Sequence, residues 1–270
     1  MIRSVASGLL WIVAVAAITV TLPVAWVALN VADEDGFVEL TAPFATDDEL
    51  GDALSAGVAD AVVETTGLPV GQQLLRELVD RAFTRLVDDP QFPEAWRESQ
   101  RASHRATFED GEQERLVLDI GPIVDLVGDE IADDLPVALP SPETIVVPVT
   151  REVQPRAIEA VRAAPSQAAL GGAVAVLASL GSVLLARRRS VALGFWGLGV
   201  VGAGGVLMLA ANRAVPDLLA TRAADSELAA TMRDLLAARA TAAFEEWLLV
   251  TVVVGGVAML VGFGSRIVRR

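Results

Sequence analysis

Residues 168–211 read AALGGAVAVLASLGSVLLARRRSVALGFWGLGVVGAGGVLMLAA, which is two uncharged apolar runs, 168–186 and 191–211, separated by an arginine cluster. A bilayer core about 30 Å thick needs roughly 20 apolar helical residues to cross it, so each run is long enough for a transmembrane helix. Two further runs, 9–31 and 247–264, have a similar length and also lack charge. The sequence therefore predicts an α-helical membrane protein with four spans.

The charges outside these runs are segregated by sign. All 35 carboxylates and the only histidine lie in 32–167 and 212–246. The other connections and the two termini carry seven arginines and no carboxylate: Arg3, Arg187, Arg188, Arg189, Arg266, Arg269 and Arg270. By the positive-inside rule the arginine side is cytoplasmic. We therefore expect a multi-pass plasma-membrane protein with both termini in the cytoplasm and with 32–167 and 212–246 outside.

The block 32–167 is long enough for a folded extracytoplasmic domain inserted between the first two spans. Its 29 carboxylates against 10 arginines disfavour nucleic acid as a partner. The chain has no cysteine, so this domain needs its own apolar core rather than disulfides. The remaining segments are an N-terminal anchor (1–31), a transmembrane hairpin (168–211), an amphipathic helix (212–246), and a fourth span with a basic tail (247–270).

Residues 9–31 are predicted to stay in the membrane as an anchor. Their apolar stretch exceeds the roughly 7–15 residues of a signal-peptide core. A signal peptide cleaved near Ala28-Leu29-Asn30-Val31-Ala32 is the alternative.

The outer domain is predicted to be mainly helical. Thr46 and Glu49 have the spacing of a capping box, which predicts a helix over 47–66. An apolar stripe from Val70 to Val87, with Leu74 in it, predicts a second helix, and a third is expected over 93–108.

Two short segments rich in β-formers, 115–120 and 144–149, are expected to pair as a small two-stranded element. Gly121-Pro122 begins a helix between them that extends to about 134. A further helix over 153–164 should lead into the second span, and the proline-rich linker 135–143 is the expected flexible loop.

In the second outer block Ser226 can cap a helix that continues into the fourth span. Its apolar face is formed by Leu228, Met232, Leu235 and Leu236. This face is expected to lie against either the large domain or the membrane surface.

The order of these features resembles a known family. A Trp-containing first span is followed by an outer domain with Phe92, Trp96 and His104, by the segment Leu116-Val117-Leu118-Asp119-Ile120-Gly121-Pro122-Ile123-Val124, and by three further spans. The chain is similar over nearly its whole length to a family of actinobacterial four-span integral membrane proteins with an extracytoplasmic helical domain. The resemblance implies the topology, and it brings no assigned activity, cofactor or catalytic residue.

Small residues at helical spacing within the spans predict close helix packing, within one chain or in a dimer. These candidates are Gly171, Ala175, Ser179, Gly199, Ala203, Ala258 and Gly262. Gly197, Gly199 and Gly202 also match a dinucleotide fingerprint, but they lie inside an apolar span and follow no strand.

His104 is the single candidate for a proton shuttle or metal ligand, and the chain offers no second histidine and no cysteine to complete a site. Acidic clusters such as Asp33-Glu34-Asp35 and Asp125, Asp129, Asp133 and Asp134 are interpreted as solvated faces rather than calcium sites. The sequence contains no recognised catalytic or nucleotide-binding motif. We therefore predict no catalytic residue, no metal and no cofactor.

These observations favour an accessory, scaffold or sensor protein of the cell envelope that acts through its outer domain. Its expected partners are the lipid bilayer and another envelope or membrane protein. A subunit of a transporter or channel is the second hypothesis, although the spans contain no ionisable residue. An envelope hydrolase is the third.

Overall fold

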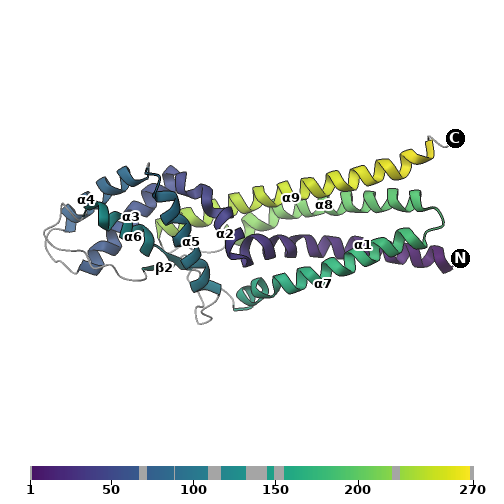
Figure 1. Cartoon of the computed structure of the whole chain (residues 1–270), viewed down its shortest axis with the longest axis horizontal. Coiled ribbons are helices and arrows are strands. Elements are labelled where there is room, and N and C mark those ends of the chain that lie inside the picture. The colour runs from purple at the N-terminus through teal and green to yellow at the C-terminus, as the bar shows by residue number, and fades with distance from the viewer. Residues whose placement is uncertain are drawn as a thin grey trace. The chain divides into compact units, whose positions relative to one another are not determined.

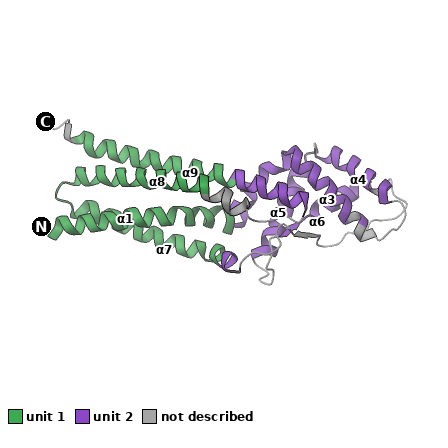
Figure 2. Ribbon diagram, turned by 180° about the vertical axis from the view of Figure 1, so that it is seen from behind, with its two compact units in different colours: residues 1–32, 160–218, 240–270 green, residues 33–159, 219–239 purple. Residues whose placement is uncertain are grey.

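The computed structural model describes residues 2–66, 72–87, 89–108, 117–131, 145–148, 155–220 and 226–267 (Figure 1). The chain forms two compact units, shown in different colours in Figure 2. Unit 1 comprises 1–32, 160–218 and 240–270, and unit 2 comprises 33–159 and 219–239. The predicted linker 135–143 lies outside the described residues.

Long helices build unit 1 and run side by side within it (Figure 2). They are α1 (Ile2–Val27), α7 (Pro155–Leu185), α8 (Arg189–Ala220) and α9 (Glu227–Ile267). A π-helical turn, η1 (Ala28–Ala32), follows α1. The predicted helix over 153–164 and the second span form one helix, α7, which continues through Pro165.

Among the described residues, four helices are long and apolar enough to cross a membrane. Large apolar side chains project from them, with Leu177 69%, Leu209 61% and Leu260 69% exposed. Burying one such side chain away from water stabilises by about 1.5–3 kcal/mol, so this surface requires hydrocarbon around it. The predicted class, an α-helical membrane protein, is confirmed.

Backbone contacts join α8 and α9. A Cβ atom at Gly197 would collide with the carbonyl oxygen of Gly255, and one at Gly262 would collide with the backbone of Gly194. Lipid tails are as apolar as the side chains of a helix, so apolar contact alone does not favour a helix partner over lipid. Close packing at small residues does favour it, because the two backbones can approach each other. The glycines therefore fix which faces of α8 and α9 meet.

Small residues also face α1. A Cβ atom at Gly171 would collide with the side chain of Thr21, and one at Gly199 would stand 2.5 Å from Val15 Cγ2. The structure thus places two of the three predicted packing glycines, Gly171 and Gly199, against α1 within the same chain.

The remaining packing candidates lie on α7, α8 and α9. Ser179 accepts a 2.9 Å hydrogen bond from the indole Nε1 of Trp196, which links α7 to α8. Ala175 and Ala203 are buried, and Ala258 is half-buried.

Unit 2 contains the predicted helices as α3 (Asp48–Thr66), α4 (Gln72–Leu86), α5 (Phe92–Phe108) and α6 (Gly121–Ile131). Two short elements before them, α2 (Glu34–Thr41) and the 3₁₀ turn η2 (Ala42–Thr46), were not predicted. The Asp33 carboxylate accepts a 2.9 Å hydrogen bond from Gly36 N and caps α2, so this residue is more than a solvated acid.

The predicted capping box at Thr46 is wrong by one residue. The Thr46 hydroxyl donates to the Pro43 carbonyl oxygen at 3.1 Å. The Asp47 carboxylate instead accepts from Leu50 N at 2.9 Å and caps α3. A carboxylate both accepts this bond and interacts favourably with the positive end of the helix dipole, which favours Asp47 over its neighbour.

The predicted strand pair is confirmed. β1 (Val117–Asp119) pairs antiparallel with β2 (Val146–Pro148), and Leu118 stands opposite Val147. Pro148 lies at the end of this ladder, where its missing N–H group removes no interior hydrogen bond.

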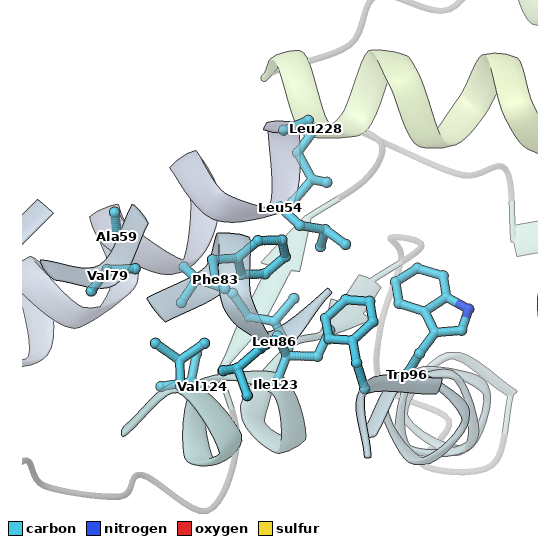
Figure 3. Packing of buried hydrophobic residues seen from close by; sticks show 14 of the residues in the cluster. Leu54, Ala59, Val79, Phe83, Leu86, Trp96, Ile123, Val124 and Leu228 are labelled. Atoms are coloured by element: carbon cyan, nitrogen blue, oxygen red, sulfur yellow. The ribbon is translucent and has the colours of Figure 1, made fainter. Parts of the chain in front are cut away.

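A continuous apolar core fills unit 2 and draws on α3, α4, α5, β1, α6 and the start of α9 (Figure 3). Trp96 is fully buried, and its Nε1 donates a 2.9 Å hydrogen bond to the Thr41 carbonyl oxygen. Phe83 of α4 and Phe92 of α5 meet edge to face, with ring centroids 5.5 Å apart. Leu74, which was predicted to belong to the apolar stripe of α4, is instead 58% exposed.

The apolar face at the start of α9 belongs to this core. Of the two predicted positions, the large domain and the membrane surface, the structure shows the first. Ser226 accepts a 3.1 Å hydrogen bond from Ala229 N and caps the helix as expected. Leu228 and Met232 are buried in the core of unit 2. Leu228 covers Gly57 of α3, where a Cβ atom would stand 3.1 Å from Leu228 Cδ2.

Candidate functional site

His104 lies on the inner face of α5 and is 4% exposed. Its ring centroid is 5.6 Å from that of Phe37 and 4.9 Å from that of Phe108. The described residues contain no group of three or more metal-ligating side chains. The position of His104 between two aromatic rings is that of a core residue.

The outer face of α5 carries ion pairs instead. Arg101 lies 3.2 Å from Glu98 and 3.7 Å from Glu94, and Arg105 lies 3.2 Å from Glu34 of α2. The hydrogen bond that the Arg101 guanidinium donates to the Glu98 carboxylate raises the pKa of Arg101 above its ordinary value. Exposed pairs of this kind contribute about 0–1 kcal/mol each, so the arginines mainly keep this face soluble.

A buried polar layer between α5 and β1 was missed by the sequence analysis. The Ser99 hydroxyl donates to the Asp119 carbonyl oxygen, and the Ser103 hydroxyl donates to the Ser99 carbonyl oxygen at 2.6 Å. The Asp119 backbone N–H donates to the Ser103 hydroxyl oxygen at 2.8 Å. The local signal was a pair of serines four residues apart on the inward face of a helix.

The Asp119 carboxylate joins the residues that follow β1 to the residue that precedes β2. Its Oδ1 accepts hydrogen bonds from Gly121 N at 2.9 Å and from Ile145 N at 3.3 Å. Asp119 is only 5% exposed, and bonds from N–H groups supply part of the stabilisation that a buried carboxylate needs. This acid therefore acts as a structural clamp between β1, α6 and the start of β2.

Gln100 is a further buried polar residue of α5. It is 1% exposed, and neither its amide oxygen nor its amide nitrogen has a hydrogen-bond partner among the described residues. An unsatisfied buried polar group costs about 1–3 kcal/mol, so this side chain destabilises unit 2.

An open groove of about 480 Å³ lies between α3 and α4. Carboxylates line it with one arginine among them: Asp52, Asp60, Glu77 and Asp80, with Arg76. Arg76 pairs with Asp60 at 2.9 Å, and Ser55 donates to Asp80 at 3.1 Å. The uncompensated charge of the groove is negative, which favours a cationic ligand.

The predicted acidic cluster of α6 is described only in part. Asp125 and Asp129 are exposed on α6, while Asp133 and Asp134 lie outside the described residues. The stretch Gly197–Gly202 lies wholly within α8, so it is not the strand-to-helix turn that a dinucleotide site requires.

Comparison with known proteins finds no matching family model, no matching curated protein and no matching solved structure.

Proposed function

We propose that this protein is a non-catalytic accessory, scaffold or sensor protein of the cell envelope, which binds a partner protein through unit 2. The proposal rests on the interactions of four potentially reactive side chains in unit 2. Ser99, Ser103 and Asp119 bond to the backbone, and His104 packs between aromatic rings. Those groups serve the fold, which leaves the surface to carry function.

The proposal includes an orientation in the plasma membrane, with unit 2 outside and both termini in the cytoplasm. The arginines that support it are Arg3 near the start of α1, Arg187–Arg189 at the α7–α8 connection, and Arg266, Arg269 and Arg270 near the C-terminus. A cysteine at Glu94 should react with a reagent that cannot cross the membrane of intact cells, and one at Arg188 should react only after lysis. Labelling of the Arg188 position in intact cells would overturn the topology.

The groove between α3 and α4 is the surface that we propose for the partner. Its negative charge would complement a partner segment that carries arginine or lysine, and such complementarity governs association rate and specificity. Binding through this groove should therefore weaken as salt is raised, because the exposed charges are screened within about 10 Å at 0.1 M.

Site-directed cross-linking in native membranes tests both the partner and the surface. The chain has no cysteine, so a single cysteine can carry a photoreactive probe. Asp52 lines the groove, and Asp125 is a matched exposed aspartate on α6. We expect Asp52→Cys to form an adduct with one protein and Asp125→Cys to form little of it.

The rival hypotheses give different results in the same preparation. Equal adducts at Asp52→Cys and Asp125→Cys would show that the groove is not the surface that binds the partner. Ion flux through liposomes that contain the purified protein alone would favour a channel or transporter, and turnover of an envelope substrate would favour a hydrolase.

A further inference from the structure

A pocket of about 360 Å³ lies in unit 1 between α1, α7 and α8. Its lining includes Ser7, Gly8 and Trp11 of α1, Ser182 of α7 and Phe195 of α8. These residues lie within about the first three turns of α1, about the first two turns of α8 and the last turn of α7. The pocket is therefore at the end of unit 1 that holds the N-terminus and the α7–α8 connection (Figure 2).

The lining changes from polar to apolar along the helix axes. The Ser7 hydroxyl donates to the Ser182 carbonyl oxygen at 2.7 Å. One turn further along α1, Trp11 Nε1 donates to the Phe195 carbonyl oxygen at 2.9 Å, so the two rings line the wall with their polar atom satisfied. At 1.5 Å per residue the serine level is about 6 Å, and the aromatic level about 12 Å, from Arg3.

Positive charge surrounds the pocket at the helix ends. Arg3 precedes the lining of α1, and the cluster Arg187–Arg189 joins α7 to α8. All of these arginines are exposed. The sequence contains no carboxylate before Asp33 or between Glu159 and Asp217, so none lies near these arginines along the chain.

We propose that this pocket binds one anionic phospholipid of the leaflet at the arginine end. The phosphate lies among the arginines, the glycerol region lies at the level of Ser7 and Ser182, and an acyl chain lies along Trp11. Three features match a lipid in this order: charge at the interface, serines just below it, and apolar walls deeper in the bilayer. The pocket volume falls within the range of small-molecule sites, about 300–1,000 Å³.

Gly8 provides a variant that fills the pocket without disturbing the helix contacts. A Cβ atom at Gly8 meets no other atom within 4 Å, although the residue lines the pocket. Gly172 of α7 is a matched control, because a Cβ atom there also meets nothing within 4 Å and the residue is not part of the pocket lining. Gly8→Leu should therefore exclude lipid, and Gly172→Leu should not.

The test is native mass spectrometry of the full-length protein in detergent, titrated with phosphatidylglycerol or phosphatidylcholine. We expect one phosphatidylglycerol to bind at least tenfold more tightly than phosphatidylcholine. Gly8→Leu should abolish this lipid adduct, and Gly172→Leu should retain it. Replacing all three residues Arg187–Arg189 by glutamine should weaken phosphatidylglycerol binding about a hundredfold, at about fivefold for each arginine.

Three results would overturn the proposal. These are equal binding of the two lipids, wild-type phosphatidylglycerol binding by Gly8→Leu, and displacement of the lipid by inorganic phosphate at equal concentration. The last result would show that the arginines bind a free anion without the pocket. Thermal unfolding of both glycine variants without added lipid checks that neither has lost its fold.

Discussion

Leu228→Ala should loosen unit 2, although Leu228 lies at the start of the helix that contains the fourth span. The side chain is 4% exposed and packs in the core against α3. Truncating a buried leucine to alanine costs about 2–5 kcal/mol, because apolar contact is lost and a cavity remains. The population of opened unit 2 should therefore rise roughly 30- to 5,000-fold.

The assay uses the absence of native cysteine. Val79 is fully buried in the core, so a Val79→Cys variant of the full-length protein in detergent reacts with a thiol reagent only when unit 2 opens. Leu228→Ala should accelerate this reaction by the factor given above. Leu249→Ala on the same helix is the control, because Leu249 is 53% exposed and lies in unit 1.

A second substitution tests whether Leu228 acts through α3. Gly57→Ala alone gains about 1 kcal/mol of helix propensity but places a methyl group 3.1 Å from Leu228 Cδ2. When Leu228 is already alanine that contact is gone, so the full gain should appear. The two substitutions should show a coupling energy of about 0.5–3 kcal/mol. Additive effects, or a labelling rate unchanged by Leu228→Ala, would refute the assignment of this part of α9 to the core.

Three further substitutions have definite expected outcomes. Gln100→Met should raise the unfolding free energy of unit 2 by about 1–3 kcal/mol in the thiol-labelling assay, because it removes an unsatisfied buried amide; a loss of stability would reveal a partner for that amide. His104→Gln should keep both expression and phenotype, since an amide can replace one hydrogen bond of the imidazole. A His104→Gln protein that accumulates normally yet has the deletion phenotype would favour the enzyme hypothesis. Gly262→Leu should disrupt the packing of α8 on α9 and lower the thermal stability of the purified protein. Gly264→Leu is the control, because a Cβ atom at Gly264 meets nothing within 4 Å. Equal melting temperatures of the two variants would contradict the backbone contact at Gly262.

The helices could be predicted because their signals are local and repeated. Continuous apolar runs identified the spans, and the stripe that includes Val79 and Phe83 identified α4. One error arose where neighbouring residues offer the same chemistry. Thr46 and Asp47 can both cap a helix, and only the structure shows which one accepts the hydrogen bond from Leu50 N.

The polar layer could not be predicted because its bonds join distant segments. Ser99 and Asp119 are 20 residues apart, and Asp119 and Ile145 are 26 apart. A serine on a helix or an aspartate at the end of a strand is usually exposed, so neither residue type indicates burial by itself. The pocket in unit 1 depends in the same way on contacts between α1, α7 and α8 that no spacing within one span reveals.

The contact of Gly197 with Gly255 has a consequence for permeability. A water molecule needs a space of its own and two to four polar partners, and backbone atoms that already touch offer it no space. The intrahelical hydrogen bonds of α8 and α9 already use the peptide groups at this contact. The seam between these two helices is therefore dry at this level, and a hydrated ion or a proton-carrying chain of water cannot pass between α8 and α9 here.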